Sequence, residues 1–309
     1  MKILINSGQP FMLAHGGMQT QIEQTRSALL AIGVETEWLR WWDDSQTGDL
    51  IHYFGTAPLG QIQQAQSKKI PFVATNLFSA TCNRSDFNLR AQGRLVRTIL
   101  RLPFGEGVKR QLAWRSFAAC SRNIVGLKAE RQVLELVYGI PRERVSVVPL
   151  GLPEIFLNAS PGERAGDYLI CVGTITEQKN CLLLAQLARQ AQTPILFVGK
   201  PYFENDPYWK KFHARLDQRW VRHQRHVTDP QAMLALLRHA RGAVMMSQFE
   251  NWCLAAHEAA ACGLPVLLPA QKWSRERFGD EAHYFTGDAS RDVEILKRFY
   301  EQSPTLPPP

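Results

Sequence analysis

Ser247-Gln-Phe-Glu250-Asn-Trp-Cys-Leu-Ala-Ala-His-Glu258-Ala-Ala-Ala-Cys-Gly263-Leu-Pro265-Val is the stretch of this sequence that says most about the fold. Apolar residues 243–246 precede it and predict a strand, after which a loop carries Glu250. A helix is expected to follow, because Gly263 and Pro265 are typical of a helix end and of the start of another strand. Glu250 is therefore predicted at the carboxyl end of a strand, where open α/β sheets bind ligands.

The start of the predicted helix offers hydrogen-bond donors to a ligand. Backbone N–H groups at a helix N-terminus have no partners inside the helix and carry partial positive charge, which suits a phosphate or a sugar hydroxyl. Glu258 lies one to two turns further on, where its carboxylate can accept hydrogen bonds from a ribose diol. Alternatively, Glu250 caps the helix and Glu258 belongs to a solvated face. The flanking elements favour a nucleotide ligand, and the residues concerned are Asn251, Trp252, Cys253, Leu254 and Glu258.

The pattern around this stretch predicts an α/β fold with two Rossmann-like, doubly wound parallel-sheet domains facing a cleft. Short β-rich runs alternate with amphipathic stretches in both halves of the chain. A polar stretch at residues 158–167 is typical of an interdomain linker, and we predict domains at residues 1–152 and 153–309. Strands are expected at residues 2–6, 34–38, 50–54, 72–75, 117–120, 145–148, 168–172, 195–198, 221–227, 243–246 and 266–268.

The composition is that of a globular protein. The chain has 309 residues, more than the roughly 250–300 at which a single core stops growing. No apolar run reaches the ~18–20 residues that span a bilayer, and the N-terminus lacks the apolar region of a signal peptide, so a cytoplasmic location is expected. The six cysteines form no Cys-x-x-Cys pair, and neither a disulfide nor a zinc site is expected.

The opening stretch resembles the Glu-x7-Glu motif of family-4 retaining glycosyltransferases, which adopt the two-domain GT-B type fold. A second segment, Gly173-Thr174-Ile-Thr-Glu-Gln178-Lys179-Asn, is similar to the family's Gly-Thr-Ile-x-x-Arg-Lys-Asn, whose basic pair meets the donor diphosphate. Gln178 stands where the family usually has arginine, so one cation is missing. Lys200 or an arginine of the first domain could replace it, and the resemblance also implies a donor contact at Val227.

In the first domain the resemblance implies contacts to the diphosphate and to the acceptor. Gly16-Gly17 precedes a helical pattern and is similar to the family's Gly-Gly loop, whose glycines allow close approach of the backbone to the diphosphate. Asn76 follows residues 72–75, where related enzymes commonly place a His-Asp pair against the donor sugar. We expect Asn76, together with Ser121, on the acceptor or sugar side.

The resemblance implies a retaining glycosyltransferase that moves a hexose from a nucleotide-diphosphate sugar to a sugar, lipid-linked or other hydroxyl acceptor. Glu250 and Lys179 are the expected catalytic residues. The sequence has no Asp-x-Asp, so we expect a metal-independent reaction without a cofactor, in which the nucleotide sugar is the co-substrate. Gln178 and Asn76 leave open an alternative, a catalytically inactive subunit that binds nucleotide sugar.

A net charge of +8 predicts attraction to polyanions. Residues 94–115 interleave basic and apolar side chains, which fits either contact with an anionic membrane or a solvated basic face over a buried one. Peripheral contact at the inner membrane face is therefore one expectation. No nucleic-acid motif accompanies the charge, so nucleic acid is not an expected partner.

Overall fold

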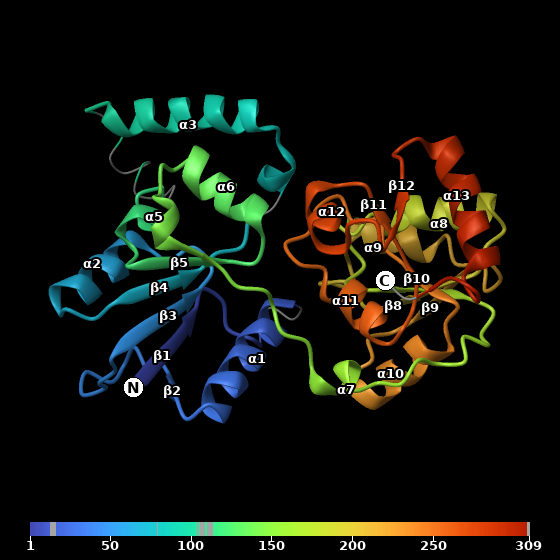
Figure 1. The fold of residues 1–309 in the computed structure, drawn as a ribbon, viewed down its shortest axis with the longest axis horizontal. Helices are drawn as coiled ribbons and strands as arrows, with labels where there is room; N and C mark the ends of the chain where they lie inside the picture. Colours follow the sequence, from blue (N-terminus) through green and yellow to red (C-terminus); the bar gives the residue numbers. More distant parts are fainter. Residues whose placement is uncertain (13–16, 79, 104, 106–108, 110–113, 308–309) are drawn as a thin grey trace. The chain divides into compact units, whose positions relative to one another are not determined.

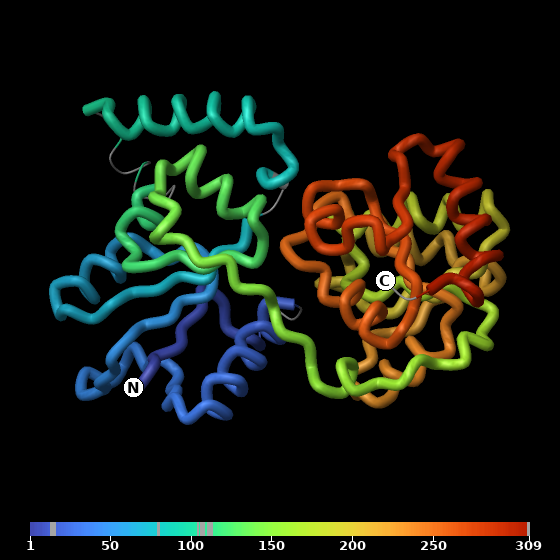
Figure 2. The backbone as a smooth tube through the Cα atoms, viewed as in Figure 1, coloured from blue at the N-terminus to red at the C-terminus, as the bar shows by residue number. Residues whose placement is uncertain are grey.

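The chain divides into two compact units, Met1–Gly151 and Leu152–Pro309. The computed structural model describes residues 1–12, 17–78, 80–103, 105, 109 and 114–307. Figure 1 shows a sheet with flanking helices in each unit, and Figure 2 shows that the chain runs through the first unit before it enters the second. Within the described part of the chain, no helix combines the length and the apolar character that crossing a membrane requires.

The sheet of the first unit has the strand order β2-β1-β3-β4-β5-β6, and its recorded pairings are all parallel. Its strands are β1 (Lys2–Ser7), β2 (Glu35–Trp38), β3 (Leu50–Phe54), β4 (Phe72–Thr75), β5 (Arg122–Val125) and β6 (Val145–Val147). The helices are α1 (Gly17–Ala31), α2 (Leu59–Ser67), α3 (Asp86–Arg101), α5 (Ser116–Ala119) and α6 (Lys128–Leu136), with short 3-10 turns at Ala80–Asn83 and Arg142–Arg144.

The second unit has the strand order β12-β11-β10-β7-β8-β9, again with parallel pairings. Its strands are β7 (Leu169–Val172), β8 (Ile195–Val198), β9 (Val221–Gln224), β10 (Gly242–Val244), β11 (Val266–Pro269) and β12 (His283–Phe285). The helices are α7 (Glu154–Leu157), α8 (Cys181–Gln190), α9 (Pro207–His213), α10 (Pro230–His239), α11 (Leu254–Ala261), α12 (Lys272–Phe278) and α13 (Ala289–Gln302). The strand order reverses between β7 and β10, so a crevice at the carboxyl ends of these two strands is the expected ligand position.

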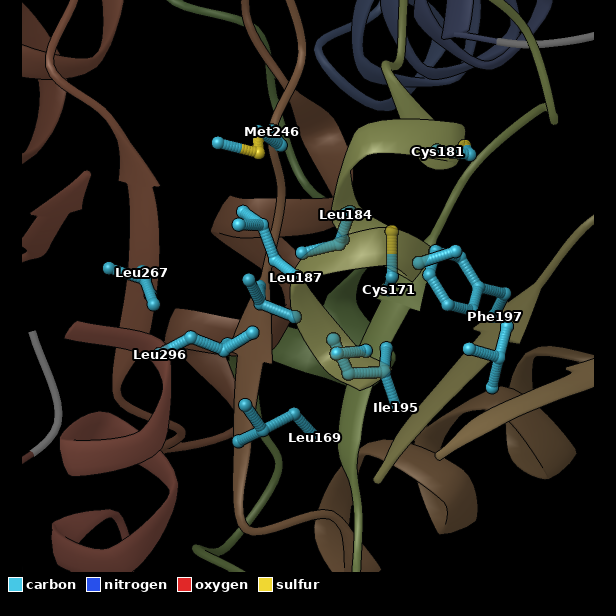
Figure 3. Packing of buried hydrophobic residues seen from close by; sticks show 14 of the residues in the cluster. Leu169, Cys171, Cys181, Leu184, Leu187, Ile195, Phe197, Met246, Leu267 and Leu296 are labelled. Atoms are coloured by element: carbon cyan, nitrogen blue, oxygen red, sulfur yellow. The ribbon is translucent and has the colours of Figure 1, made fainter. Parts of the chain in front are cut away.

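The core of the second unit lies between its sheet and helix α8 (Figure 3). Leu184 and Leu187 of α8 pack with Leu169 of β7 and Ile195 of β8, and all four side chains are fully buried. Burial of one such side chain contributes about 1.5–3 kcal/mol. This packing fixes the direction of α8, and with it the position of the loop that joins β7 to α8.

The predicted strand at residues 117–120 is wrong. These residues lie largely in α5, and the strand of this region is β5, which begins at Arg122. Asn123 of β5 is fully buried. Its side-chain amide donates a 2.9 Å hydrogen bond to the carbonyl oxygen of Phe117, which offsets the cost of burying this polar group. A polar side chain in a buried strand hid β5 from a search for apolar runs, and the short strand β12 was not predicted either.

The predicted linker at residues 158–167 is also wrong, because this segment packs on the second unit. The backbone N–H of Gly166 donates to the carbonyl oxygen of His239 at 2.8 Å. The Arg164 guanidinium donates to the carbonyl oxygens of Ser303 and Leu306, at 3.1 and 2.7 Å. A Cβ atom at Gly162 would lie 2.0 Å from a backbone oxygen. The glycines here permit close packing, and they do not mark a boundary.

Candidate functional site

An ion pair between Lys179 and Glu250 lies at the carboxyl edge of the second sheet. Lys179 belongs to the loop between β7 and α8, and Glu250 to the loop between β10 and α11. The Lys179 ammonium donates to Oε1 of Glu250. Since β7 and β10 are neighbours in the sheet, the pair sits at the point where the strand order reverses. This is where a doubly wound sheet offers its ligand crevice.

Both members of the pair are sheltered from water. The side chain of Glu250 is 9% exposed and that of Lys179 is 25% exposed. Burial by itself would lower the pKa of Lys179, but the negative charges around it, chiefly the Glu250 carboxylate, raise that pKa above its ordinary value. Lys179 is therefore a cation at neutral pH, and its ammonium group can bind an anionic ligand in place of the Glu250 carboxylate.

Gln178 ties together the two loops that carry the ion pair. Its side-chain amide donates to the backbone carbonyl oxygen of Phe249 at 3.2 Å. The backbone carbonyl oxygen of Gln178 accepts from the backbone N–H of Gln248 at 2.8 Å. Gln178 thus supplies no charge, but it fixes the backbone on either side of Lys179 and Glu250. This role was not predicted from the sequence, because the contact is made across two loops.

Helices α8 and α11 both begin beside the ion pair, and their first turns are arranged alike. The N-cap residues are Asn180 (φ 55°, ψ 35°) and Cys253 (φ 55°, ψ 64°), both in the left-handed region. Neither helix has a side-chain hydrogen bond at its cap. In α8 the backbone N–H of Leu182 already donates to the Tyr208 hydroxyl at 2.9 Å. The first backbone N–H groups of α11 are therefore the ones offered to a ligand, with the partial positive charge of a helix N-terminus.

Two glycines bring the neighbouring loops close together. The backbone N–H of Gly173 donates to Val198 at 3.0 Å, and a Cβ atom at Gly199 would lie 1.9 Å from the carbonyl oxygen of Gly173. The carbonyl oxygen of Lys200 accepts from the backbone N–H of Ile175 at 3.1 Å. A side chain at position 199 would clash with the backbone of Gly173, so the two loops meet backbone to backbone at the carboxyl edge of β7 and β8.

Glu258 lies one turn into α11 and is partly buried. Burial raises the pKa of its carboxyl group to about 7. Among the described residues no basic side chain forms an ion pair with it. A half-buried carboxyl group without a cation is a costly arrangement, and it suits a group that accepts hydrogen bonds from a neutral diol.

Trp252 is held inside the protein rather than presented to a ligand. It is 6% exposed and lies between the guanidinium group of Arg277, 3.4 Å from its ring centroid, and the imidazole of His257, stacked at 4.8 Å. The stack joins α11 and α12 and supports the loop that carries Glu250.

The remaining predicted donor residues of the second unit also follow its strands. The residues predicted after β7 are Gly173, Thr174 and Lys179, with Lys200 after β8, Val227 after β9, and Glu250, Asn251, Trp252, Cys253 and Leu254 after β10. The structure therefore brings these residues to one edge of one sheet.

Asn76 is a buried residue at the carboxyl end of β4 in the first unit. It is 1% exposed, and its amide nitrogen donates to Oδ1 of Asn123 at 2.9 Å and to the carbonyl oxygen of Ala74 at 3.3 Å. Its Oδ1 atom is buried without a hydrogen-bond partner in the described structure. Asn76 therefore has a single free acceptor, and its donor capacity is used inside the protein.

Ser121 does not join Asn76. It precedes β5, where its hydroxyl oxygen accepts from the backbone N–H of Phe72 at 3.2 Å. Phe72 opens β4 and Asn76 follows it, so Ser121 and Asn76 lie at opposite edges of the parallel sheet. The error follows from the misplaced strand at residues 117–120. Of the predicted Gly-Gly loop, Gly17 is the first residue of α1, and Gly16 lies outside the described residues.

Comparison with known proteins finds a family model that matches part of the second unit. Residues 166–294 match the family model described as "Glycosyl transferases group 1". A comparison with curated proteins finds no match.

Solved structures share the fold over nearly the whole chain. Sucrose-phosphate synthase from Thermosynechococcus elongatus superposes with a TM-score of 0.72 at 15% identity, covering 98% of this chain and 90% of that one. Anabaena HepE in complex with UDP-glucose gives 0.69 at 15%, covering 99% and 91%. S. aureus TarM gives 0.59 at 13%, covering 82% of this chain but only 48% of its own length. The two parallel-sheet units therefore have the GT-B type fold.

Proposed function

We propose that this chain, whose residues 166–294 match the group 1 glycosyl transferases, is such an enzyme. It would transfer a sugar from a nucleoside-diphosphate sugar to a hydroxyl acceptor with retention of anomeric configuration. The observation that carries this proposal is the Lys179–Glu250 pair beside the N-terminus of α11, which has no side-chain cap. A cation, a carboxylate and free backbone N–H groups at one sheet edge suit a ligand that is both anionic and polyhydroxylated.

The donor diphosphate takes the place of Glu250 as the partner of Lys179. Phosphate oxygens bind the backbone N–H groups at the start of α11, and the Lys179 ammonium moves from the carboxylate to the phosphate. As the bond between the anomeric carbon and the phosphate oxygen breaks, negative charge grows on the leaving group. Lys179 and the helix N-terminus stabilise that charge, so the chemistry needs no metal ion.

Glu250, released from Lys179, faces the transferred sugar. Its carboxylate stabilises the positive charge that develops at the anomeric carbon and accepts hydrogen bonds from the sugar hydroxyls. The acceptor oxygen bonds to the anomeric carbon on the face that the phosphate leaves. The acceptor proton passes to the departing phosphate oxygen, which balances the reaction and retains the configuration.

Glu258 and the first unit complete the proposed substrate contacts. The Glu258 carboxylate accepts hydrogen bonds from both hydroxyls of the ribose. The first unit binds the acceptor, which is a sugar, a lipid-linked sugar or another hydroxyl compound. Asn76 lies at the carboxyl edge of that unit's sheet, but its Oδ1 atom is buried and so is not assigned a direct contact with the acceptor.

Thermal stabilisation by nucleotide sugars tests the donor site. The chain is heated with a panel of UDP-, GDP-, ADP- and dTDP-sugars, because a ligand at 100 times its Kd adds about 2.7 kcal/mol to the free energy of unfolding. One donor is expected to raise the melting temperature of the native chain and of Glu301→Ala, a surface variant on α13. Glu258→Ala should lose that shift. No shift with any donor would contradict the proposal.

Turnover separates a transferase from an inactive binding subunit. With the stabilising donor, slow release of nucleoside diphosphate should continue in EDTA and should be lost in Lys179→Met. Stabilisation without any release of nucleotide, with or without acceptor, would favour the inactive subunit. A rate restored by added Mn²⁺ after EDTA would contradict the metal-independent mechanism.

A further inference from the structure

Helix α3 forms the outermost layer of the first unit, with α6 between it and the sheet (Figures 1 and 2). Its buried side is formed by Leu89, Gly93 and Val96. A Cβ atom at Gly93 would lie 2.1 Å from the carbonyl oxygen of Leu136, so α3 packs closely on the end of α6. One face of α3 is thus fixed in the unit, and the opposite face is turned to solvent.

The outer face of α3 combines basic and large apolar side chains. Phe87, Arg90, Arg94 and Arg101 recur at spacings of three, four and seven residues, which places them on one stripe of the helix. All four are exposed, Phe87 to 78%, and Leu95 beside them is 60% exposed. Phe87 and Leu95 add apolar surface to this basic face, which suits a partner that has an apolar layer behind a charged one.

The charge of this face is not neutralised by the protein. In the described part of the chain, no carboxylate forms an ion pair with Arg90, Arg94 or Arg101. The helix has one acidic residue, Asp86, in its first turn. A fourth arginine, Arg97, donates to the carbonyl oxygen of Leu136 at 3.4 Å and lies toward α6.

We propose that the outer face of α3 is a docking surface for an anionic lipid bilayer. Arginines along one stripe attract acidic headgroups, while Phe87 and Leu95 enter the boundary between headgroups and acyl chains. The helix is too polar to cross the membrane, so it lies in the plane of the interface. A nucleic acid would be held by the arginines alone and would leave the two apolar side chains in water, which is why the membrane is favoured.

The contribution of each group can be stated as a change in vesicle affinity. Each basic residue near an anionic surface strengthens binding roughly fivefold, so removal of three should weaken it about a hundredfold. Because the attraction acts between exposed charges, it should fall as salt rises from about 0.1 M to about 1 M, where the Debye length shortens from ~10 to ~3 Å.

Co-sedimentation of the full chain with vesicles tests the docking surface. One set of vesicles is phosphatidylcholine alone, and the other is phosphatidylcholine mixed with phosphatidylglycerol. The native chain should bind only the mixed vesicles. Binding should be lost in Arg90→Ala/Arg94→Ala/Arg101→Ala and weakened in Phe87→Ala/Leu95→Ala. These side chains are exposed, so unchanged melting temperatures should show that both variants fold.

A matched control removes the same charge elsewhere. Lys210, Lys211 and Arg215 are exposed on and after α9, and their triple alanine variant should bind mixed vesicles like the native chain. Equal loss in the control and in the α3 arginine variant would overturn the proposal, because net charge alone would then explain binding. Binding to a single-stranded oligonucleotide but not to mixed vesicles would also overturn it, as would no change in Phe87→Ala/Leu95→Ala.

Discussion

Nζ of Lys179 donates a hydrogen bond to Oε1 of Glu250 across 71 residues of sequence, and this pair joins the loops of β7 and β10. Lys179→Met leaves the buried Glu250 carboxylate without its cation. We expect a loss of about 2–3 kcal/mol in the free energy of unfolding, and a fall in kcat of about 10²–10³-fold. Urea denaturation and initial rates measure the two effects.

A double variant and a control on the surface show whether the pair is responsible. Lys179→Met/Glu250→Gln should recover most of the lost stability, because no buried charge remains, but none of the activity. Arg225 and Glu204 form an exposed ion pair in the same unit, and Arg225→Met should cost less than about 1 kcal/mol. Additive losses in the double variant would contradict a coupled pair.

The raised pKa of Glu258 predicts a pH dependence of stability. Its folded-state pKa is about 7, above the ordinary value of 4.5. The folded chain therefore holds a proton that the unfolded chain releases, and Glu258 lowers the stability as the pH rises from about 4.5 to about 7. Glu258→Gln cannot lose this proton. It should be more stable than the native chain by about 3 kcal/mol at about pH 8, and equal to it near pH 4.

The affinity for the donor should rise over the pH range in which the stability of the native chain falls. Because the ionised Glu258 accepts two hydrogen bonds from the ribose, donor affinity of the native chain should rise as the pH passes through about 7. The affinity of Glu258→Gln should be lower and should not change in that range. Melting curves with and without donor provide both measurements, and stability curves that stay parallel for the two chains would refute the assignment of this proton.

At position 253 a glycine variant should be more stable than an alanine variant, which is the reverse of the usual order in a helix. It is 5% exposed and adopts φ 55° at the start of α11, a conformation that costs a non-glycine residue about 1 kcal/mol or more. Cys253→Ala and Cys253→Gly both lose the buried sulfur, but only glycine releases the strain. The glycine variant should therefore be the more stable by about 1 kcal/mol in urea denaturation.

Ala256, inside the same helix, provides the comparison for Cys253. Ala256→Gly should cost about 1 kcal/mol, which is the ordinary penalty for glycine in a helix. If Cys253→Ala were as stable as Cys253→Gly, the left-handed backbone at the start of α11 would not be a source of strain.

Gln178 should act on catalysis through the loop that it holds. Gln178→Ala removes the hydrogen bond to Phe249 and should cost about 1 kcal/mol of stability. Gln178→Glu is isosteric but places a carboxylate against the Phe249 carbonyl oxygen, so it should cost more. Both should lower kcat more than they raise KM for the donor, since Glu250 is displaced and the phosphate contacts remain. A change in KM alone would contradict this positioning role.

The second unit was largely predictable because its motifs are local. Strands β7 and β10 end in Gly173 and in the loop of Glu250, and short apolar runs followed by glycine or a helix pattern are visible in any single sequence. The raised pKa of Glu258 and the bridge from Gln178 were not predictable, because they depend on neighbours that are distant in the sequence.

The first unit shows the opposite case. Its strand β5 contains the buried Asn123, whose amide is satisfied by Asn76 and Phe117, and such a residue resembles a loop when its partners are unknown. The resulting shift of one strand moved Ser121 from one edge of the sheet to the other. The prediction for this unit failed where a buried polar side chain depends on hydrogen-bond partners from distant segments of the chain.

The order of strands in the second sheet has a consequence for biosynthesis. The central strand β7 is the first strand of this sheet to leave the ribosome, and its partner β10 follows about 70 residues later. At roughly 5–20 residues per second, one edge of an apolar strand stays unpaired for several seconds on each nascent chain. During that interval β7 is open to pairing with another chain, so chaperone supply should limit the yield of this protein before its thermodynamic stability does.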